Sequence, residues 1–258
     1  RRHLLIAVRK PERQTKMKTQ RSSSTQRPAT SVVASLVVLA LSPFTALSAP
    51  TTFSDGTFID ADWSVAFVFD DTASRPATFT VNQVGTGGNP GAYRFETHRM
   101  DQGNLHVVSL HSGFLYDPAV SGAISAIDFS YDLTHPSTYS GSYWPVLAQN
   151  GTYYAPQAGD VAPLGGAWTH FGHNDLDALD FTRQFGSGAV TPDFSSSGAP
   201  MQFGYFFANT HVSGVGNFFS YSSGIDNFQV TIVPEPSTWA LLLLGGATLA
   251  LAARKRSL

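Results

Sequence analysis

The feature that most constrains this chain is the alternation of apolar and polar residues that recurs between positions 50 and 232. Large apolar residues occupy every second position in residues 63–69, 79–81, 127–133, 201–207 and 228–232. Side chains two positions apart on a strand point to the same face, so each run predicts a strand with one buried and one solvated face. No stretch of ten or more residues in this region has the apolar spacing of a helix. The region is therefore predicted to be nearly all β.

Clusters of Gly, Pro, Asn and Ser separate these runs and mark turns. Asn150-Gly151 is a strong signal of this kind, because a type I′ hairpin turn needs positive φ at both central residues. It predicts that residues 143–149 pair with residues 152–155. Ten or more short strands without an internal repeat are typical of an all-β, jelly-roll-like antiparallel β-sandwich of two sheets. We assign this body to residues 49–232.

The charge of the body argues against a nucleic-acid partner. Residues 50–232 contain four Arg and no Lys against fifteen Asp and Glu96, a net charge of −12. Nucleic acids are bound through Lys and Arg on their phosphates, which this composition does not supply. The chain also has no Cys. That absence excludes a disulfide framework, a thiolate zinc site and a cysteine nucleophile.

The residues before the body have the layout of an export signal. Residues 1–16 show neither apolar periodicity nor a capping pattern, so we interpret them as an untranslated or disordered leader and Met17 as the start. A basic segment, ten apolar residues at 32–41 and a small-residue exit then follow. Residues 17–48 are predicted to form a signal-peptide helix, cut by signal peptidase after Ser48 or after Ala49. The alternative is an ordinary buried helix.

The residues after the body combine prolines, an apolar segment and a basic end. Pro234 and Pro236 should stop the preceding strand, because proline has no N–H. Residues 239–253 carry no charge, a length of roughly 22 Å as a helix at about 1.5 Å per residue. We predict a single transmembrane helix over residues 237–253, followed by a basic tail, residues 254–258, on the cytoplasmic side.

This order of features, VPEPSTWALLLLGGATLALAARKRSL at residues 233–258, resembles a PEP-CTERM sorting signal. The resemblance implies an exported protein of a Gram-negative bacterium that makes extracellular polysaccharide, with the tail recognised by an exosortase. It implies passage through the secretion machinery, transient anchoring in the inner membrane and a final place at the cell surface or in an extracellular biofilm matrix. The residues that the resemblance assigns to sorting are Pro234, Glu235, Pro236, Arg254, Lys255 and Arg256. The alternative is a plain single-pass anchor.

Three short motifs within the body, DGTFIDADWS at 55–64, GGNPGAYRF at 87–95 and GIDNFQV at 224–230, resemble concanavalin A-like or laminin-G-like jelly rolls. A turn between two strands explains the glycines and the proline of the second motif equally well.

The sequence offers little support for catalysis. Glycoside hydrolysis needs two carboxyl groups about 5 to 10 Å apart, and the body has one glutamate, Glu96. Asp128 and Asp132 would share a strand face about 13 Å apart, at 3.3 Å per residue, which is too far for a pair. No Gly-x-Ser-x-Gly nucleophile elbow occurs. We therefore assign no catalytic residue.

Aromatic residues concentrate between positions 139 and 168, and sugar sites use aromatic faces beside carboxylates and amides. Adjacent residues on a strand face opposite ways, so one of Tyr143 and Trp144 should be buried and the other exposed. The candidate glycan-binding residues are Tyr143, Trp144, Tyr153, Tyr154 and Trp168.

The loop near residue 175 is rich in oxygen ligands. Asn174, Asp175 and Asp177 could bind a structural calcium, although the spacing lacks the glycine and terminal Glu of an EF-hand. His170 and His173 are too sparse for zinc. The alternative is a solvated acidic loop in which Asp180 caps a turn.

Together these features predict an exported, exosortase-sorted surface or matrix protein whose sandwich binds extracellular polysaccharide without catalysis. One alternative is a structural or adhesive protein that contacts protein, and another is a secreted polysaccharide hydrolase. An exposed aromatic platform would favour glycan, a flat apolar patch would favour protein, and a cleft with close Asp pairs would favour hydrolysis.

Overall fold

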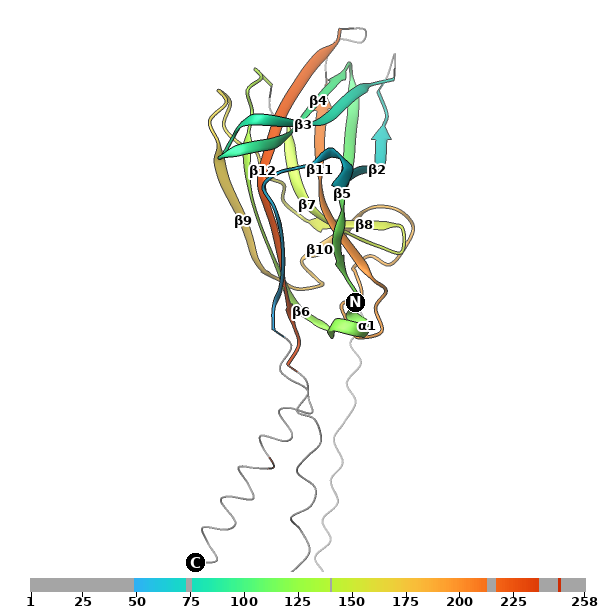
Figure 1. Ribbon diagram of the computed structural model, residues 1–258. Coiled ribbons are helices and arrows are strands. Elements are labelled where there is room, and N and C mark those ends of the chain that lie inside the picture. Colours follow the sequence, from blue (N-terminus) through green and yellow to red (C-terminus); the bar gives the residue numbers. More distant parts are fainter. Residues whose placement is uncertain (1–48, 73–75, 140, 213–216, 237–245, 247–258) are drawn as a thin grey trace, which may run out of the picture. The chain divides into compact units, whose positions relative to one another are not determined.

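The computed structural model describes residues 49–72, 76–139, 141–212, 217–236 and 246. These residues form an all-β sandwich of two antiparallel sheets (Figure 1). The predicted signal peptide, the basic tail and, apart from Gly246, the predicted transmembrane helix lie outside the described residues. Within the described part, no helix combines the length and the apolar character that a membrane crossing requires.

The sandwich contains two six-stranded sheets. The first sheet has the order β3-β4-β12-β6-β9, with β1 also paired to β12. Its strands are β1 (Thr51–Asp55), β3 (Thr78–Gly88), β4 (Gly91–Met100), β6 (Ile124–Thr134), β9 (Thr169–Leu176) and β12 (Phe219–Pro234). The second sheet has the order β10-β8-β7-β11-β5-β2. Its strands are β2 (Trp63–Asp70), β5 (Gly103–Tyr116), β7 (Ser142–Gln149), β8 (Thr152–Pro156), β10 (Phe181–Phe185) and β11 (Met201–His211). Two short helices, η1 (Asp60–Asp62) and α1 (Pro118–Ser121), complete the described elements.

The last strand in the described part of the chain, β12, organises the first sheet. It pairs along one side with β6 and along the other side first with β4 and then with β1. The register shifts at Asp226 and Asn227, where Asn227 has a φ of 51°. This bulge lies at the point where the partner on one side changes from β4 to β1. Figure 1 shows β12, in orange to red, running the length of the sandwich.

The main core lies between the two sheets and follows the predicted alternation. The inward-facing residues of β6, β11 and β12 that the periodicity selects are at most 1% exposed. They are Ile127, Phe129, Tyr131, Leu133, Met201, Phe203, Tyr205, Phe207, Phe228, Val230 and Ile232. The two-sheet sandwich is thus confirmed, and its inner faces are the ones that the sequence pattern marked.

The Asn150-Gly151 hairpin is also confirmed. Both residues have positive φ, 52° and 70°, and the strands pair as Gln149 with Thr152, Ala148 with Tyr153 and Leu147 with Tyr154. Gly87 to Gly91 likewise form the turn between β3 and β4.

The alternation in β2 is interrupted, which corrects the prediction for that strand. Trp63 and Val65 pair with His111 and Ser109, but Phe67 pairs with Val108, because a bulge at Ala66 shifts the register. A bulge inserts one unpaired residue and inverts the facing of everything after it. Trp63 therefore enters the main core, whereas Phe67 packs against the opposite face of the second sheet.

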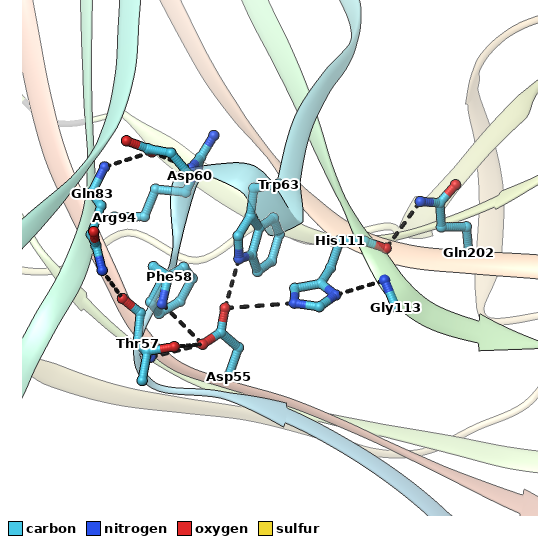
Figure 2. A network of polar contacts seen from close by, with 10 residues as sticks. All are labelled: Asp55, Thr57, Phe58, Asp60, Trp63, Gln83, Arg94, His111, Gly113 and Gln202. Carbon is cyan, nitrogen blue, oxygen red and sulfur yellow. Dashed lines mark hydrogen bonds and ion pairs between the residues drawn. The ribbon is translucent and has the colours of Figure 1, made fainter.

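A buried carboxylate ties the start of the sandwich together (Figure 2). Asp55 accepts hydrogen bonds from the Trp63 indole N–H at 2.7 Å, from the Phe58 and Thr57 backbone N–H groups and from the Thr57 hydroxyl. Burial opposes ionisation of this carboxyl, but the donated hydrogen bonds outweigh it and lower the pKa of Asp55. The network joins the end of β1 to the first residue of β2.

Candidate functional site

The outer face of the second sheet carries a second apolar cluster that the main core does not include. In a two-layer sandwich this face is normally polar, because it faces solvent. Here β5, β7, β8 and β11 place Val108, Leu110, Val146, Ala155, Phe206 and Ala208 on it, with further aromatic rings packed around them. We call the ring-bearing surface the outer aromatic face and define it by Phe67, Phe69, His106, Trp144, Tyr153, Phe185 and Phe206.

Aromatic rings from the two edge strands of the second sheet, β2 and β10, meet on this face. Phe67 on β2 lies 5.5 Å from Tyr153 on β8 and 4.8 Å from Phe185 on β10, measured between ring centroids. The Tyr153 hydroxyl donates to the Ala66 carbonyl at 3.1 Å. Since β2 and β10 are opposite edges of the sheet, these contacts require a strongly curled sheet. The bulge at Ala66 turns Phe67 toward the inside of that curl.

Trp144 joins the outer aromatic face through Phe206. Its ring stacks on Phe206 with a centroid distance of 4.6 Å and an interplanar angle of 10°. A Cβ atom at Gly159 would lie 2.3 Å from the Trp144 ring, so the loop after β8 approaches the indole closely. Only a residue without a side chain fits at position 159.

His106 is the titratable imidazole on this face. It lies between Phe69 and Phe206, with centroid distances of 5.5 and 6.0 Å. Burial lowers the pKa of His106, partly opposed by the nearby Asp71 carboxylate. The ring is therefore neutral at neutral pH, and the outer aromatic face carries no formal charge there.

The structure separates the five candidate glycan-binding residues into three places. Trp144 and Tyr153 lie on the outer aromatic face. Tyr143 and Tyr154 face the main core, with exposed fractions of 0% and 3%. Trp168 contacts Tyr93 at 5.2 Å and donates its indole N–H to the Gly87 carbonyl. Tyr143 and Trp144 thus face opposite ways, as the strand geometry predicts.

A polar cluster surrounds the turn near Trp168. Asp132 on β6 accepts hydrogen bonds from the side-chain amides of Asn89 and Asn227 and pairs with His170 at 2.8 Å. Asp226, opposite Asp132 in the β6–β12 register, is fully buried. Burial and the Asp132 and Asp55 carboxylates raise the pKa of Asp226, opposed by the Asn89 and Asn227 backbone N–H groups. Asp132 and Asp226 thus connect the turn between β3 and β4 to the bulge in β12.

The predicted calcium ligands lie at the end of β9 and in the turn after it. The Asp175 N–H donates to the Asp128 carboxylate at 2.7 Å, and the Asp177 carboxylate accepts from the Leu179 N–H. Asp180 accepts from the Asp177 N–H at 2.9 Å. In the described part of the chain, no three or more His, Cys, Asp or Glu residues form a group that could hold a metal ion. Calcium at Asn174, Asp175 and Asp177 stays a prediction.

Sequence reasoning missed most of the outer aromatic face. The alternating run predicts that Phe67 and Phe69 share a face with Trp63, because an extra residue at a bulge leaves no mark in such a run. Phe206 reads as the polar-side neighbour of buried residues on β11, and only its size signals that this side is also covered. Phe185 and His106 come from strands far apart in sequence.

The start of the proline-containing tail is part of the sandwich. Pro234 is the last residue of β12, so the strand ends at the first proline, as predicted, and two residues beyond the predicted end of the body. Pro234 is buried and pairs with Ile124. The Glu235 N–H donates to the Ala123 carbonyl at 2.7 Å, and the Ser125 hydroxyl donates to the Val233 carbonyl at 2.9 Å. Glu235 and Pro236 are exposed.

Comparison with known families assigns this tail. Residues 233–257 match the PEP-CTERM protein-sorting motif. The chain carries a sorting motif of this type. The PEP-CTERM motif implies export and processing by an exosortase, as the sequence resemblance predicted, and it covers only the end of the chain.

Several solved structures share a similar arrangement of strands at low similarity. A family 11 carbohydrate-binding module from Clostridium thermocellum, in complex with a β-1,3-1,4-mixed-linked tetrasaccharide, has 11% identity and a TM-score of 0.43, covering 72% of this chain and 96% of that chain. The family 11 module of the cellulosomal cellulase Lic26A-Cel5E of the same organism has 12% identity and a TM-score of 0.42, covering 68% and 91%.

A xylan-binding domain of Paenibacillus barcinonensis Xyn10C has 9% identity and a TM-score of 0.34, covering 67% of this chain and 96% of that chain. Similarity this low carries no argument about a ligand. No curated protein matches the chain.

Proposed function

We propose that the sandwich binds a neutral extracellular glycan through the outer aromatic face, without catalysis. The observation that supports this proposal is a set of partly exposed aromatic rings around the buried Phe206, on a sheet face that is normally polar. Trp144, Tyr153 and Phe67 are half-buried, and Phe69 is 38% exposed. Aromatic faces pack against the apolar face of a pyranose ring, and Tyr and His add groups that can hydrogen-bond to hydroxyls.

The charge of the body supports a neutral ligand. Its net charge of −12 repels uronic acid and sulfate groups, and the seven residues of the outer aromatic face include no cation at neutral pH. A polysaccharide of neutral hexoses or pentoses meets no such penalty. The aromatic rings supply the contact area, and electrostatics exclude acidic polymers.

The arrangement of carboxyl groups supports a binding role over hydrolysis. None of the seven residues that define the outer aromatic face is an acid, and the one carboxylate described beside it, Asp71 near His106, accepts hydrogen bonds from Asn104. These residues therefore do not supply the pair of carboxyl groups that glycoside cleavage requires. The neighbouring pair Asp132 and Asp226 belongs to the first sheet, where the two side chains are 7% exposed or less and hold the turn through hydrogen bonds. Glu96 is fully buried.

The sorting motif supports a location outside the cytoplasm. We propose that signal peptidase and the secretion machinery deliver the chain to the inner membrane, where the exosortase acts on it, and that the sandwich then serves at the cell surface or in the extracellular matrix. Glycan binding would retain it in a polysaccharide layer.

A protein-contacting, adhesive role is the second candidate. Val65, Val68 and Phe69 on β2 are 38–39% exposed, and β2 is an edge strand of its sheet. Exposed apolar residues on an edge strand are typical of surfaces that pair with another protein.

The test is binding of the full chain in detergent to a panel of neutral and acidic polysaccharides, with calcium and with chelator. Trp144→Ala and Phe69→Ala should each weaken binding to a neutral glycan about tenfold, because each removes a ring from the contact surface. Trp168→Ala is the matched control and should bind like the wild type. Loss of binding in chelator would support the predicted calcium loop.

Two results would contradict the proposal. The first is saturable binding that Trp168→Ala abolishes and Trp144→Ala leaves intact. The second is an absence of binding to every polysaccharide, which would favour the adhesive role.

A further inference from the structure

The first residues of the sorting motif are fixed by the sandwich. Val233, Pro234 and Glu235 all have backbone groups hydrogen-bonded or paired to residues 123–125, and Pro234 is buried. An enzyme that reads a free, extended peptide could not bind this segment without opening the pairing of β6 with β12. In the folded chain, Glu235 is presented to an enzyme as part of a folded surface.

That surface contains a pocket with Glu235 in its wall. The pocket has a volume of about 430 Å³, within the range of ligand-sized pockets. Its lining includes Ile124, Asp177, Leu179, Phe194 and Glu235. We call this lining the exit surface, because the chain leaves the sandwich here. Figure 1 shows α1 and the start of β6 at the same end as the end of β12.

The chemistry of the exit surface is apolar with an acidic rim. Leu179 is 77% exposed, so a large apolar side chain faces solvent here. Phe194 and Ile124 form a buried apolar floor. Asp177 and Glu235 supply two carboxylates, and the described residues that line the pocket include no Lys or Arg. A long side chain with an apolar stem and a cationic head, such as Arg or Lys, fits these groups.

We propose that the exit surface is a docking site for the sorting enzyme, which inserts a basic side chain beside Glu235 and contacts Leu179. The argument for this occupant is continuity, because Glu235 belongs both to the PEP-CTERM motif and to the pocket wall. The enzyme then recognises a folded end of the body together with the peptide. The inference does not depend on glycan binding.

The test follows processing of the full chain in a host with an active exosortase, by pulse-labelling and mass. Leu179→Ser should slow the conversion to the shorter form about fivefold or more, because it removes an exposed anchor of the contact. Val212→Ser is the matched control and should be processed normally, because Val212 is an 80% exposed valine directly after β11 that does not line the pocket. Circular dichroism checks that both variants fold.

Charge variants test the basic partner. Leu179→Lys should be processed more slowly than Leu179→Glu, because the added positive group repels a cationic side chain of the enzyme, whereas an added carboxylate attracts it. Wild-type rates for both Leu179→Ser and Leu179→Lys would overturn the proposal, as would equal slowing by Val212→Ser. Normal processing of Leu179→Ser, together with weaker flotation of this variant than of the wild type on anionic vesicles, would also overturn the proposal. That result would assign the exit surface to contact with the membrane.

Discussion

Asp55 shows how one buried side chain fixes the conformation of several neighbours. Its four accepted hydrogen bonds come from three residues, and one of them, Phe58, has a φ of 52° and a fully buried ring. Positive φ is unfavourable for a bulky residue, so the hydrogen bond and the stacking of Phe58 on Trp63 must stabilise that backbone. The carboxylate therefore holds both the turn and the first core aromatic.

Asp55→Asn should destabilise the sandwich by about 2 kcal/mol at neutral pH, because charged acceptors contribute more than neutral ones and the amide cannot accept at both oxygens. The native pKa of Asp55 is lowered, so the stabilisation is complete above the unfolded value near 4 and is lost as pH falls through the native pKa. The measurement is urea unfolding of both proteins at several pH values. A difference that stays constant below pH 4 would contradict this account.

At the scale of elements, the loop after β8 is positioned by the absence of a side chain at Gly159. Gly159→Ala should displace the Trp144 ring, because the new Cβ would lie 2.3 Å from it. We expect a loss of about 1–3 kcal/mol and a red-shifted tryptophan emission. Gly85→Ala is the matched control, since a Cβ there has no neighbour within 4 Å and should change neither property. Unchanged emission in Gly159→Ala would show that the loop moves instead of the ring.

For the strands and hairpins, the part of the fold that could be predicted from the sequence is the part that depends on local signals. The inner faces of β6, β11 and β12 follow from strict alternation, and the β7–β8 hairpin follows from Asn150-Gly151, because both signals are local. The outer aromatic face depends on the bulge at Ala66 and on contacts between β2, β8 and β10. These contacts arise from the curl of the sheet, which is a property of all six strands together. Of the seven residues of the outer aromatic face, the local concentration of aromatic residues in the sequence points to Trp144 and Tyr153 only.

At the scale of the whole molecule, the acidic body predicts how binding responds to salt. Affinity for a neutral glycan should change less than twofold between 50 and 500 mM NaCl, because no charge pairing contributes to it. Weak binding to an acidic polysaccharide should strengthen with salt as repulsion is screened. Isothermal titration at both salt concentrations measures this, and a neutral-glycan affinity that falls steeply with salt would argue for an ionic site elsewhere.

The place of β12 in the first sheet also determines when the protein can fold. This strand is the last that the structure describes, yet β1, β4 and β6 all pair with it. Until residue 234 has been synthesised and delivered, those three strands expose unpaired N–H and C=O groups and the first sheet cannot close. The pairing of β12 that completes the first sheet therefore also brings Glu235 to the exit surface. A nascent chain that crosses a membrane would therefore remain unfolded enough for translocation until β12 emerges. Only after that would the sorting motif be presented at the end of a folded domain.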